Sequence, residues 1–579
     1  MELVSAKKDF SDEQVNSSTP TKTQPVLDSL RKIQNYERKR GINSVSLFAK
    51  GAYYYNVKDY KKAKFYFEKT ALVNYDNTLI TCLMKTCNKL NYMHDMKSHF
   101  EKAKETLEKS GTFWQLYGYL EFELKNHDSA ADCFLMARRL GFEDTKLNEE
   151  FLSGSLDLAR RVDELYEFTF ELIKNGNNEP KIVDFFLSSA VETSHFKEAH
   201  QFFETTSFDW RAHAKLNALA ALTYNAVEED AEKCIELNLR AAELDPSNVR
   251  IKWNLGLTQL RLGQIKSGIE NYKIRFDWEE FPSPRRIFNV PKWHENVPKY
   301  ARILIWTEQG LGDEILFSSA IQAFIKKFPN IIFETHSKTT EIMQIAFPDI
   351  HCRTGVYKKD DLTSLYNDFE YQVPLGDVFL WFLEQNIASL ENGNNLENLN
   401  YLQPDRLRSF YWKEKLSQKS SKPKVGFAWT SANLEMGRGN HHTSLYDWSD
   451  MLRRDDVDFV SIQYNFDYEQ IASQYPDLAD CFCNTGFLDQ MDDLEGAIAL
   501  ISNLDLVISS PSSASHLAGA AGVPTWYYGA TAPFMLGRKG DFVKNPFFPN
   551  MQLYITKDAS QDKNLPSIFN QRLDMFLQK

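Results

Sequence analysis

The residues best suited to chemistry lie in the segment 308–315, which reads Glu-Gln-Gly-Leu-Gly-Asp-Glu-Ile. The apolar run at 303–306 predicts a buried strand before it, and spaced apolar residues predict a helix after it. Gly310 and Gly312 let the backbone turn tightly and approach a ligand. The helix start offers N–H groups to an anion. Asp313 can therefore cap this helix or act as a general base.

A second candidate segment follows the strand expected at 506–509. The turn at 510–515 reads Ser-Pro-Ser-Ser-Ala-Ser, and the next residues, His516 to Gly522, are mostly small, which predicts a helix packed close to a sheet. The hydroxyls of Ser512, Ser513 and Ser515, with the helix N–H groups, would form a cradle for a diphosphate. His516 could donate to the same anion. The structural alternative is a well-capped helix with a core histidine.

Composition limits the class of protein. The chain has 579 residues, enough for three or four domains, and a net charge of −12 argues against nucleic-acid binding. No apolar run reaches the ~18 residues of a membrane span. The seven cysteines show neither disulfide nor zinc spacing, which indicates reduced thiols and predicts a cytoplasmic protein.

Residues 1–34 are polar and predict a disordered leader. Residues 35–278 predict helical repeats of tetratricopeptide type, in which small residues on paired helices admit an aromatic side chain. Two units fit that register well: Gly51, Tyr54, Ala63 and Phe67, and then Gly118, Ala130, Phe134 and Ala137. Such a solenoid usually binds a peptide or protein and could also pair two copies of the chain. An unrelated helical bundle is the alternative.

From residue 279 onward short apolar runs alternate with amphipathic stretches, which predicts parallel sheets with helices on both faces. The strands expected are 303–306, 331–333, 371–373, 425–429, 459–462, 506–509 and 525–528. A polar stretch at 391–400 divides this half into two α/β domains, 279–400 and 401–579. Ligands of such domains bind at the carboxyl ends of the strands.

Three segments in this order, 308–315, 425–430 and 503–524, resemble the two-domain GT-B glycosyltransferases related to the lipopolysaccharide heptosyltransferases. The chain is similar in particular to bacterial proteins in which tetratricopeptide repeats precede such a transferase. The resemblance covers about residues 240–556. It implies a GT-B fold made of twin Rossmann-like domains, and sugar transfer from a nucleotide donor with inversion and without a metal or other cofactor.

The resemblance also implies roles for particular residues. Asp313 would be the base that deprotonates the acceptor. The residues expected at the donor or its phosphates are Gly310, Gly312, Trp429, Thr430, Gln463, Ser512, Ser513, Ser515 and His516. Further candidates are Arg438, His441, His442, Tyr527, Tyr528 and Arg538. The chain departs from the family at Pro511 and Ser512, where an Asp-Thr pair is usual.

The favoured hypothesis from sequence is a transferase that modifies Ser, Thr or Asn side chains of a protein held by the repeats. Flagellin or an adhesin would be such an acceptor. One alternative is a glycan or lipid-linked acceptor, which predicts a basic or apolar membrane-facing patch. Another is a scaffold that has lost catalysis, for which the departure at Pro511 is the reason.

Overall fold

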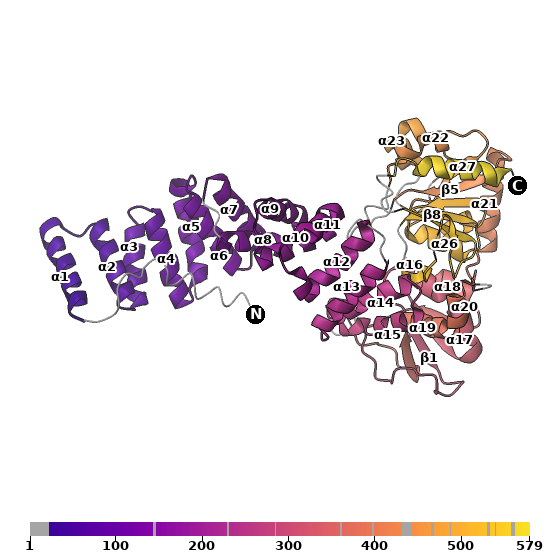
Figure 1. Cartoon of the computed structure of the whole chain (residues 1–579), viewed down its shortest axis with the longest axis horizontal. Coiled ribbons are helices and arrows are strands. Elements are labelled where there is room, and N and C mark those ends of the chain that lie inside the picture. The colour runs from indigo at the N-terminus through magenta and orange to yellow at the C-terminus, as the bar shows by residue number, and fades with distance from the viewer. Residues whose placement is uncertain are drawn as a thin grey trace. The chain divides into compact units, whose positions relative to one another are not determined.

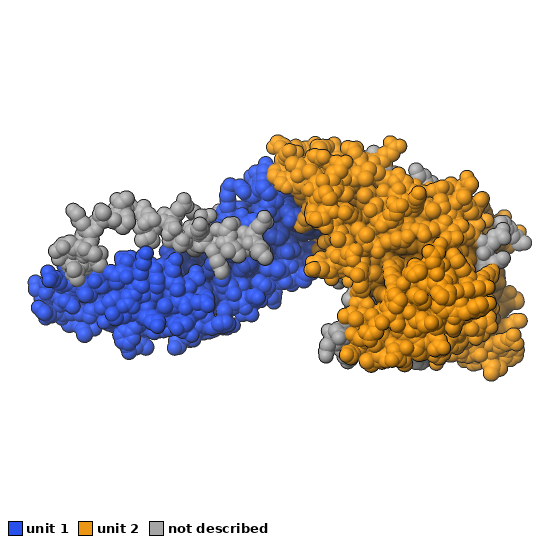
Figure 2. Space-filling view, turned by 90° about the horizontal axis from the view of Figure 1, so that it is seen from below, with its two compact units in different colours: residues 1–189 blue, residues 190–579 orange. Residues whose placement is uncertain are grey.

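A computed structural model describes residues 23–578, apart from the short segments 143–145, 228–230, 284, 359–361, 397–398, 431–442, 465–467, 487, 530–532, 539 and 557–561 (Figure 1). The chain divides into two compact units, residues 1–189 and residues 190–579 (Figure 2). Each unit is described by itself below. Helix α10 contains the boundary between them.

The repeat half consists of antiparallel helices in a regular succession. The first helices of successive pairs begin 33 to 35 residues apart, which is the tetratricopeptide period. They are α2 (Ser44–Asn56), α4 (Asn77–Leu90), α6 (Gly111–Glu123), α8 (Lys146–Leu158), α10 (Pro180–Glu192), α12 (Ala214–Val227) and α14 (Val249–Arg261). The second helices are α3 (Tyr60–Ala71), α5 (Met93–Leu107), α7 (His127–Arg139), α9 (Val162–Lys174), α11 (Phe196–Thr205), α13 (Ala231–Leu244) and α15 (Ile265–Tyr272).

The predicted register of small and aromatic residues is confirmed. A Cβ atom added at Gly51 would lie 2.5 Å from the ring of Phe67, and one added at Gly118 would lie 2.8 Å from the ring of Phe134. Glycine is therefore required for the second helix to pack this closely. Salt bridges between residues 33 apart, such as Arg138 to Glu171 at 2.9 Å, link neighbouring repeats.

The predicted leader is partly helical. Helix α1 (Thr23–Arg40) begins within it and packs against α2, so residues 23–34 are not an extended tail. Leu30 and Ile33, three residues apart, are half-buried on this helix, and that spacing is what an amphipathic helix needs. Residues 1–22 lie outside the described part of the chain.

The first α/β domain has one parallel sheet in the order β3-β2-β1-β4. Its strands are β1 (Ile303–Trp306), β2 (Ile331–Thr335), β3 (His351–Thr354) and β4 (Tyr371–Pro374), and its helices are α16 (Leu311–Ser318), α17 (Ile321–Lys327), α18 (Thr340–Ala346), α19 (Leu375–Gln385) and α20 (Ile387–Glu391). Ile303 and Ile305 face the helices in one large core. Leu304 and Trp306 face the other side.

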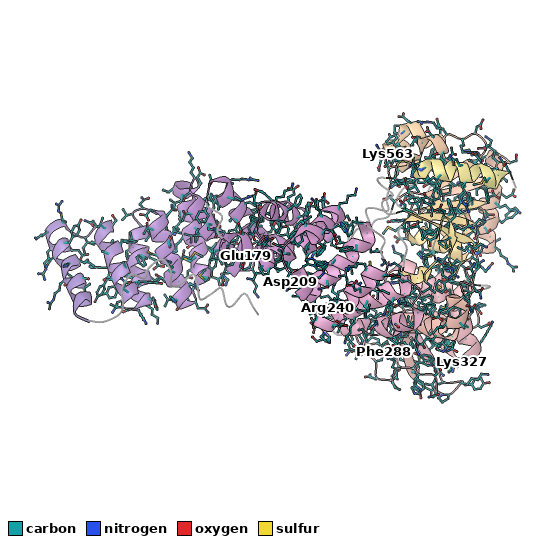
Figure 3. The ribbon with its side chains drawn as sticks, viewed as in Figure 1. Glu179, Asp209, Arg240, Phe288, Lys327 and Lys563 are labelled. Carbon is teal, nitrogen blue, oxygen red and sulfur yellow. The ribbon has the colours of Figure 1, made fainter. Side chains whose placement is uncertain are left out.

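Helices were expected on both faces of this sheet, and here that expectation is wrong. The face that carries Trp306 is covered by the segment joining the repeats to β1, whose Phe276 and Phe288 pack on the Trp306 ring at 5.5 and 5.7 Å (Figure 3 labels Phe288). Aromatic side chains of this junction, in which Phe276 lies on the short 3-10 helix Arg275–Asp277, bury the apolar face as an α-helix would. The junction is therefore a structural part of the first domain.

The second α/β domain has a six-stranded sheet in the order β6-β5-β7-β8-β10-β9, parallel except for β9. The strands are β5 (Lys424–Ala428), β6 (Asp458–Ser461), β7 (Leu506–Ser509), β8 (Thr525–Gly529), β9 (Val543–Lys544) and β10 (Met551–Ile555). Helices that include α25 (Leu494–Ile501) and α26 (Ser513–Ala520) pack on one face, and α22 (Ser449–Leu452) and α27 (Leu565–Leu577) on the other. α21 (Arg406–Lys419) precedes β5 and packs against α25.

Candidate functional site

The structure brings the two candidate segments of the α/β half together. Helix α16 of the first domain packs against helix α26 of the second (Figure 1). A Cβ atom added at Gly312 would lie 3.6 Å from Nδ1 of His516. Asp313 is close enough that its charge acts on His516. Residues 204 positions apart in the sequence, Gly312 and His516, thus converge beyond the carboxyl ends of strands from the two sheets.

Asp313 is the third residue of α16, and its side chain reaches back to the N-cap residue Gly310. Its Oδ2 accepts a hydrogen bond of 3.3 Å from the N–H of Gly310 at the start of α16. A carboxylate in this first turn is also favoured by the helix dipole. Capping does not prevent a role as base, because a carboxylate has more than one acceptor position.

The left-handed residue of this turn is Gln309, with φ of +62°, whereas Gly310 has φ of −90°. A Cβ atom at Gly310 or Gly312 would make ordinary contacts, at 3.7 and 3.6 Å. The expectation that these glycines are needed for a tight turn is therefore wrong. What they do is keep side chains away from the surface beside Asp313 and His516.

A buried carboxylate, Glu314, supports the turn from below. It accepts hydrogen bonds from the hydroxyl of Thr307 at 2.5 Å, from the backbone N–H of His336 at 3.0 Å, and from the hydroxyl of Thr339. Its side chain is fully buried. Buried carboxylates need such partners, so Glu314 joins β1, β2 and α16 at the end of the sheet.

An ionic network lies on the other side of the turn. Arg275, fully buried after the last repeat, donates to both oxygens of Glu308, at 2.8 and 2.5 Å, and lies 2.8 Å from Asp377. Lys292 lies 2.5 Å from Asp377. Burial alone would lower the pKa of Arg275, but the two carboxylates raise it above its ordinary value. Arg275 is therefore permanently charged and fixes the end of β1.

The second turn is closed by its own hydroxyls. The hydroxyl of Ser515 donates to the carbonyl of Ser512 at 2.7 Å and accepts from the Ser512 N–H at 3.4 Å. Ser509 donates to the carbonyl of Ser510 at 2.7 Å, and Ser510 to the carbonyl of Thr430 at 3.3 Å. These bonds hold the N-terminus of α26 in place, so the cradle predicted there would consist chiefly of backbone N–H groups.

His516 is half-buried on the first turn of α26. Burial lowers its pKa below the ordinary 6.5, although the hydrogen bond to the Ser512 carbonyl and the charge of Asp313 act the other way. Nδ1 lies 3.2 Å from that carbonyl, which can only accept, so Nδ1 carries the proton. In neutral His516 Nε2 is then an acceptor. The imidazole would donate to an anion from Nε2 only after gaining a second proton.

Other candidates at the second sheet have structural contacts. Gln463 accepts the backbone N–H groups of both Trp429 and Thr430 at 3.1 Å and so joins the ends of β5 and β6. Trp429 and Tyr528 lie in an apolar cluster, with exposed fractions of 2% and 0%. Residues buried to this degree can form the wall behind a ligand. The fully buried Tyr528 is not placed to contact a sugar directly.

The remaining candidates lie farther from the two turns or beyond the described residues. Tyr527 is buried, and its hydroxyl donates to the sulfur of Met535 at 3.4 Å. Arg538 donates to the carbonyls of Gly393 and Asn394 at 3.3 and 2.6 Å, so it joins the second domain to the segment between the domains. Arg438, His441 and His442 belong to the segment 431–442, outside the described part of the chain.

The described residues also bear on metal binding and on membranes. No three His, Cys, Asp or Glu side chains there are grouped as metal ligands would be. None of the described helices combines the length and apolar character needed to cross a bilayer.

Comparison with known proteins finds no family model that matches. The chain is 26% identical over 354 residues to Protein FlbA of Caulobacter vibrioides, a stretch that covers 59% of this chain and 57% of the relative. The chain therefore spans little more than half the length of that curated relative.

Solved structures similar to parts of the chain are of two kinds. E. coli ADP-heptose lipopolysaccharide heptosyltransferase II is 12% identical, covers 48% of this chain and 98% of its own, and has a TM-score of 0.31. A family 9 glycosyl transferase from Veillonella parvula is 14% identical, covers 49% of this chain and 93% of its own, and has a TM-score of 0.31. YrrB, a tetratricopeptide protein with an unusual peptide-binding site, is 19% identical, covers 32% of this chain and 95% of its own, and has a TM-score of 0.28. At scores of this size none of them assigns an activity.

Proposed function

We propose that the chain is a glycosyltransferase that moves a sugar from a nucleotide-sugar donor to a protein acceptor. The observation that carries the proposal is the meeting of Asp313 and Gly312, on the first domain, with the N-terminus of α26 and His516, on the second. A base and an anion-binding helix end, on two parallel α/β domains, are what transfer from a diphosphate donor requires. The motif resemblance described above supports the same reaction class.

In the proposed reaction an acceptor oxygen attacks the anomeric carbon from the side opposite the diphosphate. The new carbon–oxygen bond forms as the bond to the diphosphate breaks, and the bonding electron pair leaves with the diphosphate. Asp313 takes the proton of the acceptor, and the configuration is inverted. The N–H groups of α26 stabilise the leaving charge, and no metal is invoked for this step.

The repeats are proposed to hold the acceptor protein. In the first unit a polar recess of about 540 Å³ lies between consecutive repeats, lined by Arg138, Lys146, Glu149, Asn175 and Glu179 (Figure 3 labels Glu179). Its charged and amide groups suit an extended polar peptide better than an apolar helix. The acceptor side chain would be Ser, Thr or Asn, for example on flagellin or an adhesin.

The test is transfer by the Asp313→Asn variant. Asparagine can still accept the Gly310 N–H and so keep the cap, but it cannot take a proton. We expect a loss of roughly 10²- to 10⁴-fold in turnover, the usual worth of a general base, with the melting temperature nearly unchanged. The assay follows release of nucleoside diphosphate from a panel of nucleotide sugars in the presence of proteins captured by the repeats.

The matched control is Asp447→Asn. Asp447 accepts the N–H of Ser444 at 2.8 Å, a capping-box contact of the same kind at the start of another short helix in the second domain. Equal losses in both variants would contradict the role of Asp313. If no nucleotide sugar binds at all, a scaffold without catalysis is the better account.

One surface favours the second candidate, transfer to a lipid-linked glycan. Helix α21 exposes Leu407, Phe410 and Tyr411 on one face, with exposed fractions of 81%, 63% and 55%. Arg406 and Lys413 are exposed beside them. Apolar side chains flanked by cations on one helix suit the surface of an anionic membrane.

That candidate predicts flotation of the full chain with phosphatidylglycerol vesicles and weaker flotation with phosphatidylcholine vesicles. Replacing Leu407 and Phe410 by Ser should abolish it. A wild-type chain that stays with the soluble fraction in both cases would leave the protein acceptor as the better hypothesis.

A further inference from the structure

We propose that Tyr272, on the last repeat helix, is a positioning residue for the turn that carries Asp313, and that it acts through Gln309. The significance for catalysis rests on the proposed function, but the contact itself does not. In this account the last repeat is part of the catalytic machinery, and it controls the geometry of the proposed base.

The first observation is the strain at Gln309. This residue adopts φ of +62°, a left-handed conformation that costs a side-chain-bearing residue about 1–2 kcal/mol. Such a conformation persists only where the surroundings impose it. Gln309 immediately precedes Gly310, whose N–H is bonded to Asp313, so any relaxation of Gln309 moves the cap and the base.

The second observation is how Gln309 is held. Its side-chain amide donates to the Tyr272 hydroxyl at 2.7 Å, and its backbone N–H donates to the hydroxyl of Ser283 at 2.5 Å. Its carbonyl accepts from Nε2 of His336 at 3.1 Å. The partners come from three separate segments: the last repeat, the junction and the loop after β2. The bond from the repeat is the one that uses the side chain.

The third observation is that the last repeat belongs to the core of the transferase half. Tyr272 is 1% exposed and lies in one apolar cluster with residues of both α/β domains, and its ring contacts Phe534 at a centroid distance of 5.9 Å. The N–H of Gly537 donates to the carbonyl of Arg261 at 2.9 Å. Burial raises the pKa of Tyr272, with Asp313 among the charges acting on it, so its hydroxyl stays protonated and can pair with Gln309.

The physical consequence follows from these contacts. If the hydroxyl of Tyr272 is removed, the ring still fills its place in the core, but Gln309 loses one of its three restraints. The turn can then relax toward an ordinary negative φ. A displacement of the base by even a fraction of an ångström weakens proton transfer, because the reaction depends on the orientation of the groups.

The experiment is amide hydrogen exchange of peptides that span residues 308–315, in the full-length chain. For Tyr272→Phe we expect exchange about threefold to tenfold faster in this segment, the factor expected for one lost hydrogen bond. The control is Tyr224→Phe, which removes the hydroxyl of another buried repeat tyrosine whose partner is Glu204. It should leave this segment unchanged.

A second variant separates positioning from general loosening. Gln309→Gly removes both the side chain and the penalty for positive φ. In that background Tyr272→Phe should have no further effect on residues 308–315, since the two changes act on one contact. If Tyr272→Phe alone leaves exchange as in the wild type, or if its effect persists in full beside Gln309→Gly, the inference is overturned.

Enzyme kinetics test the catalytic consequence separately from the hydrogen-exchange experiment. If transfer is observed, Tyr272→Phe should lower kcat about tenfold or more while KM for the nucleotide sugar changes less than twofold, because the donor cradle lies on α26. Reduced donor affinity at unchanged kcat would contradict the positioning role. If no nucleotide sugar is turned over, the proposed function fails, and the exchange result still decides whether Tyr272 positions the turn.

Discussion

The turn at residues 308–315 is held chiefly by other segments of the chain, whereas the turn at residues 510–516 is held chiefly by bonds among its own residues, with Ser510 also joined to Thr430. Gln309 in the first turn is held by the last repeat, the junction and the loop after β2. The second turn is closed by bonds between its own serines and the Ser512 carbonyl. The first turn is therefore more open to the influence of the rest of the chain than the second, which carries the proposed anion-binding helix end.

The difference assigns different sensitivities to the two halves of the site. Changes in the repeats next to the α/β domains should alter the proposed base and leave the donor cradle as it is. Changes within the serine turn should do the reverse. The following substitutions test that division.

The largest effect is expected from Arg275→Met. It leaves Glu308 and Asp377 buried without their common cation, so unfolding of residues 190–579 should become easier by about 3–5 kcal/mol. Urea unfolding monitored by tryptophan fluorescence measures it. The control Lys273→Met breaks an exposed ion pair with Glu384 and should cost about 1 kcal/mol or less. Equal costs would mean that the first turn is not anchored by this network.

Ser515→Ala should have a smaller and local effect. It removes the hydroxyl that caps α26, for which the expected loss is about 1 kcal/mol. Amide exchange should accelerate in residues 510–520 and stay unchanged in residues 308–315. Acceleration in both segments would show that the second turn is not independent of the first.

The pKa of His516 predicts the direction in which the stability of the chain changes with pH. Because burial lowers its pKa in the folded chain, the unfolded chain takes up the proton first as pH falls below 6.5. Stability from this group is thus complete above pH 6.5 and is lost progressively below it, with a slope of at most one proton. His516→Gln should remove that part of the slope in thermal melts between pH 7.5 and pH 5. An unchanged slope would contradict a buried neutral imidazole.

Gly312→Ala should have the smallest effect on stability. The Cβ atom of the new alanine would make an ordinary contact with His516, so the free energy of unfolding should change by only about 0.5 kcal/mol. Affinity for nucleoside diphosphates, measured by calorimetry, should nevertheless fall, because the methyl group occupies the open surface between the turns. Gly519→Ala serves as the comparison. Its Cβ atom would overlap the side chain of Met551, so this variant should unfold much more readily than Gly312→Ala.

Much of the fold could be predicted from periodicity. The apolar runs predicted strands β1 and β7 with the bounds observed, since the strands of a parallel sheet are buried on both faces and read as continuous apolar runs. Strand β3 was missed because it is an edge strand with His351 and Thr354 exposed, and so it lacks an apolar run. Strand β9 has two residues and leaves no pattern to detect.

The site was predictable in its parts but not in its assembly. Asp313 and His516 were found because a cap and a helix start have local signatures. The role of Gln309 was not predicted, because a glutamine in the sequence does not indicate a left-handed conformation. The adjacent glycines were the obvious candidates for that conformation. Arg275 and Tyr272 fall within the segment 35–278 that was assigned to the repeats, and only tertiary packing reveals their contacts with the turn.

The central claim is that the two turns form one site. The most direct measurement is amide hydrogen exchange of the wild-type chain with and without a saturating nucleoside diphosphate, chosen from a panel of uridine, guanosine, adenosine and cytidine forms. The account predicts that one of them slows exchange in residues 510–520 and in residues 308–315 together. Protection of only one segment, or of neither by any member of the panel, would contradict it.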